Sequence, residues 1–131
     1  MKNFLMVTAT LLTAALPILA QSSFNRRSSP ALTDPYQSGL KVYYKTWADL
    51  NDAQRRVAPN PGDWYRYDVA RGQMDLLERT WSDGSFDGKQ LNEAIADLRF
   101  VLDVNHLAPL DRDILAADLN QLRDIRIQYG G

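Results

Sequence analysis

The sequence predicts an all-α protein, an up-down bundle of four helices that follows an N-terminal signal peptide and a flexible leader. Three observations predict this fold. Apolar residues recur every three or four positions along the chain after residue 33, turn-forming residues separate one such stretch from the next, and no stretch alternates apolar and polar residues as a half-buried strand does. Because the connections are short, helices that follow one another are expected to be antiparallel neighbours.

The first twenty residues have the layout of a secretory signal peptide. Lys2 provides the positive start, an apolar run extends from Phe4 to about Leu16, and Pro17 and the small Ala20 precede a polar segment. We expect a Sec-type export, to the periplasm of a bacterium or to the outside, with cleavage after Ala20. The alternative is that the run stays in place as a membrane anchor.

Residues 21–33 are rich in Ser, Asn and Arg and show little periodicity, which predicts a flexible leader. Residues 34–129 carry all the helical patterns. Removing 20 of the 131 residues leaves 111, enough for one domain with a hydrophobic core. We therefore expect a single helical domain at 34–129.

Composition excludes several classes of protein. The chain has no cysteine, so disulfides and thiolate metal sites are absent. Removal of residues 1–20 takes one of the 15 basic residues and none of the 16 acidic ones, which leaves a formal charge of −2. A near-neutral chain of this kind is not drawn to nucleic acid or to anionic membranes. With the signal peptide cleaved, no stable membrane insertion is expected.

The first helix is predicted to begin at Asp34, a good N-cap, with Pro35 in the first helical position and Gln37 as the capping-box partner. It runs without interruption towards Ala58. Its predicted core positions are Tyr36, Leu40, Tyr43, Trp47, Leu50 and Val57.

The second helix follows the turn at 59–62, with Asp63 as its predicted N-cap, and ends before Gly84, the predicted left-handed residue. Its predicted core positions are Trp64, Tyr67, Ala70, Met74, Leu77 and Trp81.

The third helix is predicted to end at the turn residue Asn105, and Pro109 is predicted to begin the fourth, which has Asp111 and Asp113 in its first turn. The predicted core positions of these two helices are Leu91, Ile95, Leu98, Leu102, Leu115, Leu119, Leu122, Ile125 and Tyr129.

One segment, residues 82–94, allows two interpretations. Asp83, Ser85, Asp87 and Gly88 stand where the first, third, fifth and sixth residues of an EF-hand calcium loop stand, so the segment resembles the first half of such a loop. That resemblance implies a weak calcium site at 83–94, whose ligands are the side chains of Asp83, Ser85 and Asp87 and the carbonyl of Lys89.

The second half of the segment departs from the EF-hand pattern and favours a helix cap. Gln90 replaces the usual aliphatic eighth residue, and Ala94 replaces the glutamate that closes the ligand sphere at position twelve. With Asp87 as N-cap, Gln90 becomes the capping-box partner, and Phe86 packs on Leu91 as a hydrophobic staple. The cap is our main interpretation, with no cofactor; calcium is the alternative.

The sequence does not indicate an enzyme. Di-iron bundles need two Glu-x-x-His motifs, and the chain has one histidine, His106, in a predicted connection. No serine stands in a strand-turn-helix elbow. Pairs of carboxylates at helical spacing, such as Asp75 and Glu78, are expected on a solvated face.

Exposed aromatic residues suggest a weak contact surface instead. We expect Tyr44 and Tyr65 to flank the core stripes and, with the nearby Arg55, Arg56 and Arg66, to form a surface for a protein or another envelope component. The functional expectation is a small exported binding or structural module without catalysis.

Overall fold

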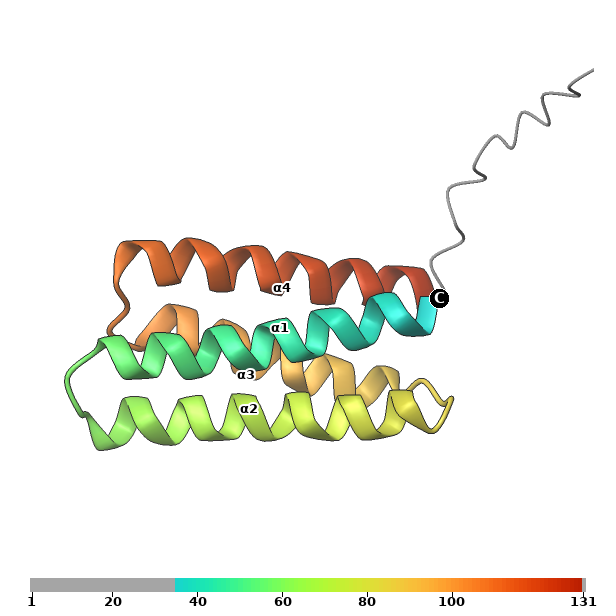
Figure 1. Ribbon diagram of the computed structural model, residues 1–131, viewed down its shortest axis with the longest axis horizontal. Coiled ribbons are helices and arrows are strands. Elements are labelled where there is room, and N and C mark those ends of the chain that lie inside the picture. Colours follow the sequence, from blue (N-terminus) through green and yellow to red (C-terminus); the bar gives the residue numbers. More distant parts are fainter. Residues whose placement is uncertain (1–34, 131) are drawn as a thin grey trace, which may run out of the picture. The chain divides into compact units, whose positions relative to one another are not determined.

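The computed structural model describes residues 35–130, which fold into four helices with no strand among them. The helices are α1 (Pro35–Arg56), α2 (Pro61–Ser82), α3 (Gly88–Val104) and α4 (Pro109–Tyr129). They lie side by side as a bundle (Figure 1), which confirms the all-α prediction.

Several predictions fall on the part of the chain before Pro35. The signal peptide at 1–20, the leader at 21–33 and the N-cap at Asp34 lie outside the described residues. Within residues 35–130, no helix combines the length and the apolar character needed to cross a membrane.

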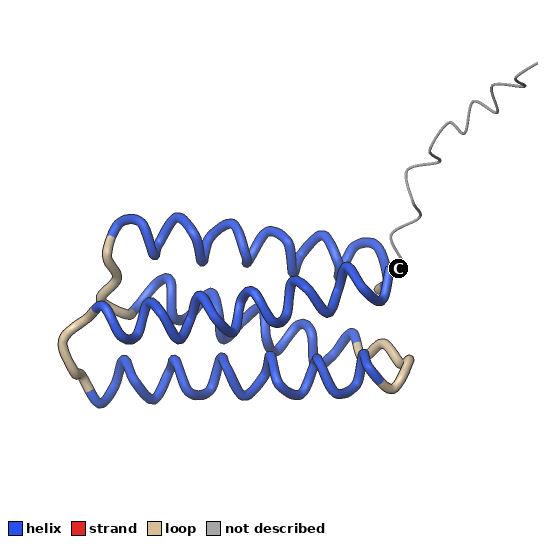
Figure 2. The backbone as a smooth tube through the Cα atoms, in the orientation of Figure 1, coloured by secondary structure: helices blue, strands red, loops and turns tan. Residues whose placement is uncertain are grey.

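Each helix packs against two others. Close contacts join α1 to α2, α2 to α3, α3 to α4 and α4 back to α1, so the four helices surround a single core. Figure 2 shows the connections at 57–60 and 105–108 at one end of the bundle and the connection at 83–87 at the other.

The core follows the predicted three- and four-residue spacing closely. Its buried apolar side chains come from all four helices: Tyr43, Leu50, Ala53, Tyr67, Ala70, Met74, Leu77, Trp81, Leu91, Ala94, Leu98, Val101, Leu102, Leu115, Leu119, Leu122 and Ile125. The predicted core residues Leu40, Val57, Ile95 and Tyr129 are only partly buried and pack against its edge.

Two tryptophans that were predicted to be core residues are exposed at the surface instead. Trp47 is 37 % exposed and Trp64 is 41 % exposed. In α1 the inward positions belong to Tyr43, Thr46 and Leu50, so Trp47 is turned about 100° away from the inward Thr46. The prediction was wrong by one position because the large apolar residue, and not the smaller Thr46, was assigned to the stripe.

The start of α2 also differs from the prediction. Asn60, not Asp63, is the N-cap, and its side-chain oxygen accepts hydrogen bonds from the N–H groups of Gly62 at 3.0 Å and Asp63 at 3.2 Å. Pro61 takes the first helical position, where its fixed φ suits the helix and its missing N–H costs nothing. Asp63 is therefore the third residue of the helix, within its first turn, where it is buried.

The predicted turns around α3 are confirmed. Asp87 caps the helix by accepting a hydrogen bond from the N–H of Gln90 at 3.0 Å, and Gly84 has a φ of +78°, the left-handed conformation. Asn105 ends α3, and Pro109 begins α4. The predicted capping box is only half formed, because the side chain of Gln90 does not return to the N–H of Asp87. It accepts a hydrogen bond from the Thr80 hydroxyl at 3.0 Å instead, which ties the start of α3 to α2.

Aromatic rings close the end of the bundle that holds the 83–87 connection, which we call the aromatic end. The Trp81 ring packs edge to face on the rings of Tyr43, Phe86 and Tyr129, with centroids 5.7, 5.9 and 5.2 Å away. A Cβ atom at Gly39 would lie 2.6 Å from Trp81 Cε2, so this position has room only for glycine.

Candidate functional site

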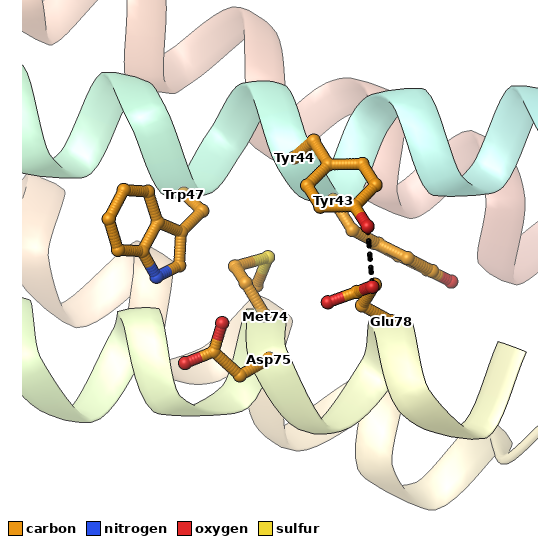
Figure 3. A pocket seen from close by; sticks show the side chains of 6 residues that line it. All are labelled: Tyr43, Tyr44, Trp47, Met74, Asp75 and Glu78. Carbon is orange, nitrogen blue, oxygen red and sulfur yellow. Dashed lines mark hydrogen bonds between the residues drawn. The ribbon is translucent and has the colours of Figure 1, made fainter. Parts of the chain in front are cut away.

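A groove between α1 and α2 gathers exposed rings and carboxylates (Figure 3). Tyr44 and Trp47, three residues apart on α1, form one wall, and Asp75 and Glu78, three residues apart on α2, form the other. The buried Tyr43 and Met74 lie beneath them. The groove has a volume of about 270 Å³ and is open to solvent.

A hydrogen bond crosses the groove at one end. The Tyr44 hydroxyl donates to Glu78 Oε1 at 2.5 Å, which fixes the position of the carboxylate relative to the ring (Figure 3). The pKa of Tyr44 is raised, chiefly because its proton serves this hydrogen bond and secondly by burial. Tyr44 thus remains a neutral donor well above neutral pH.

A cation already contacts the ring at the other end. The Arg71 guanidinium lies 5.7 Å from the centre of the Trp47 ring, within the range of a cation–π interaction. Arg71 also donates to Asn51 Oδ1 at 3.0 Å and pairs with Asp68, so its position is fixed from both helices. The surface of Trp47 is therefore used to hold a positive charge.

The two carboxylates of the groove have no such cationic partner. Neither Asp75 nor Glu78 forms an ion pair with any residue of the described range 35–130. In Figure 3 the Asp75 carboxylate and the indole nitrogen of Trp47 face the same space between the helices. The arrangement presents two negative charges beside aromatic rings, which is the chemistry of cation recognition.

The five predicted surface residues do not form one surface. Tyr44 lies in the α1/α2 groove, whereas Tyr65 lines a second groove, between α2 and α3, with Val69, Asp97 and Phe100. Arg66 lines this second groove too, and its guanidinium lies 5.6 Å from the centre of the Phe100 ring. The arrangement therefore separates Tyr44 from Tyr65.

The three arginines predicted for this surface differ in whether they form ion pairs with buried carboxylates of the bundle. Arg66 binds Asp63, with Nη2 to Oδ1 at 2.6 Å, and Arg56 pairs with the buried Asp111. Arg55 is exposed. Two of the three arginines therefore hold buried carboxylates.

Asp83, Ser85 and Asp87, the three side chains of the calcium alternative, are all exposed and all lie in the 83–87 connection. Ser85 Oγ donates to the Thr80 carbonyl at 3.1 Å, and Asp87 Oδ1 accepts the capping hydrogen bond from Gln90. Across residues 35–130, no three acidic or histidine side chains are grouped so as to hold a metal ion.

Sequence reasoning missed the buried polar residues Asp63, Asn105 and Asp111 at the end opposite the aromatic rings. We call this end the polar end and define it by these three residues together with the partly buried Arg66 and the exposed His106. Asp63 Oδ2 accepts from the backbone N–H of His106 at 3.1 Å and lies 3.0 Å from its ring Nδ1. Asn105 Nδ2 donates to the Asp63 carbonyl at 3.1 Å. These contacts join the start of α2 to the end of α3.

The pKa of Asp63 reflects this network. Burial alone would raise the pKa, but the hydrogen bonds from the His106 backbone, the His106 ring and Arg66 outweigh it, so the pKa is lowered. Asp63 is thus charged in the folded protein at neutral pH. The sequence contains a sign of this burial, because Asp63 precedes the buried Tyr67, Ala70 and Met74 at the three- and four-residue spacing of the core.

A second buried carboxylate was also missed, midway along the bundle. Asp118 of α4 is fully buried, and its Oδ1 accepts from Lys45 Nζ at 2.6 Å, while the same ammonium donates to Asp49 Oδ2 at 2.6 Å. Asp118 Oδ2 is buried without a hydrogen-bond partner. Burial raises the pKa of Asp118 to about 6, against the opposing effect of Lys45 and with a further rise from Asp49.

Comparison of the sequence with models of known protein families, with curated proteins and with solved structures gives no match.

Proposed function

We propose that the chain is an exported up-down four-helix bundle that acts as a non-catalytic binding module. Contacts between α2 and α3 support the antiparallel arrangement of this pair. Arg66 Nε, near the start of α2, donates to Oδ1 of Asn105, at the end of α3, at 2.5 Å, and Thr80, near the end of α2, donates to Gln90, near the start of α3. Export rests on the signal-peptide pattern of residues 1–20.

The observation that carries the binding function is the α1/α2 groove. Tyr44 is 59 % exposed and Trp47 is 37 % exposed, although both stand next to core positions of α1. Large aromatic side chains beside a hollow are typical of contact sites, where they contribute much of the binding energy. The partner is a protein or another envelope component, and the acidic wall of the groove disfavours nucleic acid.

A photo-crosslinking experiment tests this proposal. Benzoylphenylalanine replaces Tyr44 in the full chain, expressed in its native cells, and the matched control carries it in place of Tyr65, which is 70 % exposed in the other groove. We expect an adduct of higher mass from position 44 and none from position 65. Adducts from position 65 alone, or from neither position, would refute the assignment of the groove.

Export is tested on the same cells by fractionation and by sequencing the N-terminus of the chain. We expect the protein outside the cytoplasm with Gln21 as its first residue. A cytoplasmic protein that begins at Met1 would contradict export, and an envelope protein that retains residues 1–20 would favour the membrane anchor.

Weak calcium binding at 83–94 is the second candidate, favoured by the spacing of Asp83, Ser85 and Asp87 and by their exposure in one short segment. Its ligand set is small, and Asp87 already caps α3. Thermal unfolding of residues 21–131 in millimolar calcium and in chelator decides between the two roles. A higher melting temperature in calcium that Asp87→Ala abolishes would support a ligand loop.

A further inference from the structure

The two carboxylates of the α1/α2 groove are placed to act on one ligand. Asp75, which is exposed, and Glu78, which is half-buried, are three residues apart on α2, so they lie on the same face of the helix. The hydrogen bond from Tyr44 restrains Glu78, and Asp75 lies opposite Trp47 (Figure 3). A positive group that enters between the helices therefore meets two negative charges and two rings.

The internal contacts of the groove indicate which charge it accepts. Trp47 already interacts with the Arg71 guanidinium, whose side chain is only 19 % exposed. Arg71 itself is engaged by Asp68 and Asn51, which leaves Asp75 and Glu78 unneutralised within residues 35–130. The complementary ligand is a second cation, placed between Trp47 and Tyr44.

The apolar surface of the groove indicates the shape of that cation. Tyr43 and Met74 close the groove from beneath and are each only 1 % exposed, so the apolar surface that a ligand can reach is that of Tyr44 and Trp47. A lysine side chain has a flexible stem of four apolar carbons that can lie along such rings, while its compact ammonium reaches a carboxylate. The planar guanidinium of an arginine would have only the Tyr44 ring to lie on, because Arg71 already contacts the Trp47 ring.

We propose that the α1/α2 groove binds the ammonium group of a lysine side chain presented by a partner protein. This inference rests on the proposed binding function and specifies the chemistry of its partner. Charge complementarity carries it: two carboxylates without cations, one of them restrained by Tyr44, line a groove with exposed aromatic walls.

Titration with short peptides tests the proposal on residues 21–131. The probes are acetyl-Gly-Lys-Gly-amide, its neutral analogue with norleucine in place of lysine, and butylammonium as a free amine. The readout is the indole N–H resonance of Trp47 in ¹H–¹⁵N spectra, assigned with Trp47→Phe. We expect saturable shifts with the lysine peptide and at least fivefold weaker binding of the norleucine peptide.

The variants locate the effect. The double change Asp75→Asn and Glu78→Gln should weaken binding of the lysine peptide at least fivefold, and 0.5 M salt should weaken it too. Asp97→Asn, which removes the carboxylate of the α2/α3 groove, is the matched control and should leave binding unchanged. Melting temperatures of all variants show whether the fold is kept.

Each outcome has a defined meaning. Equal binding of the lysine and norleucine peptides, or no shift of Trp47 with either, would overturn the ammonium site. Tighter binding of butylammonium than of the lysine peptide would overturn the protein source of the ammonium. If the peptides fail while the crosslinker at position 44 still captures a partner, the binding module stands and only its lysine chemistry is wrong.

Discussion

At the aromatic end the rings of Tyr43, Phe86 and Tyr129 surround Trp81, whereas at the polar end the buried Asp63 and Asp111 are each matched by an arginine. The aromatic end gains stability by removing apolar surface from water, an effect without direction and without dependence on pH. The polar end depends on charge-assisted hydrogen bonds, which need defined partners and a defined protonation state.

The two ends of one bundle thus join their helices in two physically different ways. Loss of a ring leaves a cavity at any pH, while loss of a buried carboxylate leaves an arginine and a backbone N–H without their acceptor. The two ends should therefore respond differently to substitution, to acid and to salt. Five substitutions in four experiments, taken from the largest expected effect to the smallest, test this difference.

Trp81→Ala should cause the largest loss, about 3–5 kcal/mol of the free energy of unfolding, because it removes the ring on which the other three pack. Urea unfolding at pH 7 and at pH 3 measures it. The loss should be the same at both pH values. A loss that shrinks markedly in acid would mean that the aromatic end also depends on charge.

Asp63→Ala should cost about 2–3 kcal/mol at pH 7, because Arg66 and the N–H of His106 lose their acceptor. The pKa of Asp63 is lowered by folding, so its stabilisation is present above the ordinary carboxyl pKa and is lost as the pH falls through the folded-state value. Urea unfolding from pH 7 to pH 2 should show the variant approaching the native chain in acid. An equal loss at every pH would contradict a role for the charge.

Asp118→Asn tests a carboxylate between the two ends and should stabilise the protein by about 1–2 kcal/mol at pH 7. Burial raises the pKa of Asp118 to about 6, so the native chain should lose stability as the pH rises from about 4 through 6. Asparagine still offers Lys45 an acceptor and should remove that slope. Urea unfolding at pH 4, 5, 6 and 7 measures this pH dependence. If the free energy of unfolding of the variant still falls between pH 4 and pH 6, another group is responsible for the slope.

Asn60→Ala and Asp87→Ala remove one helix cap from each end and should each cost about 1 kcal/mol. Since both side chains only satisfy N–H groups of a first turn, their losses should be alike although the two ends differ. Thermal unfolding with and without calcium compares them. A loss for Asp87→Ala that appears only in calcium would favour the ligand loop over the cap.

The fold was predictable because all four helices repeat one spacing. Core residues at steps of three and four, together with Gly84, Asp87 and Pro109, were enough to predict the helices and most of their ends. Errors arose where a large apolar residue stands beside a smaller inward one, as Trp47 stands beside Thr46. The spacing alone does not distinguish the two, because the choice depends on how closely the neighbouring helix packs.

The buried carboxylates show a different limit. Asp111, Leu115, Asp118 and Leu122 follow the same steps as the core, so the pattern marks both aspartates as inward. From the sequence, Asp111 was predicted only to interact favourably with the dipole of the fourth helix, and no role was predicted for Asp118. Their partners, Arg56 and Lys45, belong to α1 and are more than fifty residues away, which local sequence patterns do not reveal.

The candidate groove was predictable only in its parts. The helical spacing of Asp75 and Glu78 and the surface position of Tyr44 were foreseen. The sequence did not predict that these residues lie together in one groove. Their proximity depends on the rotation of α1 relative to α2, which the packing of the whole core determines. Tyr65 was grouped with Tyr44 by residue type, although the two belong to different grooves.

Because α1 packs against α4, the order of the helices along the sequence could be changed by circular permutation. Figure 1 shows the beginning of α1 and the end of α4 at the same end of the bundle. A short Gly/Ser linker from Gly130 back to Pro35 would therefore span a small gap, and new termini could be opened in the exposed connection at 57–60. Such a circular permutant should keep all four helix interfaces and fold, because the bundle depends on which helices are neighbours and not on which one comes first.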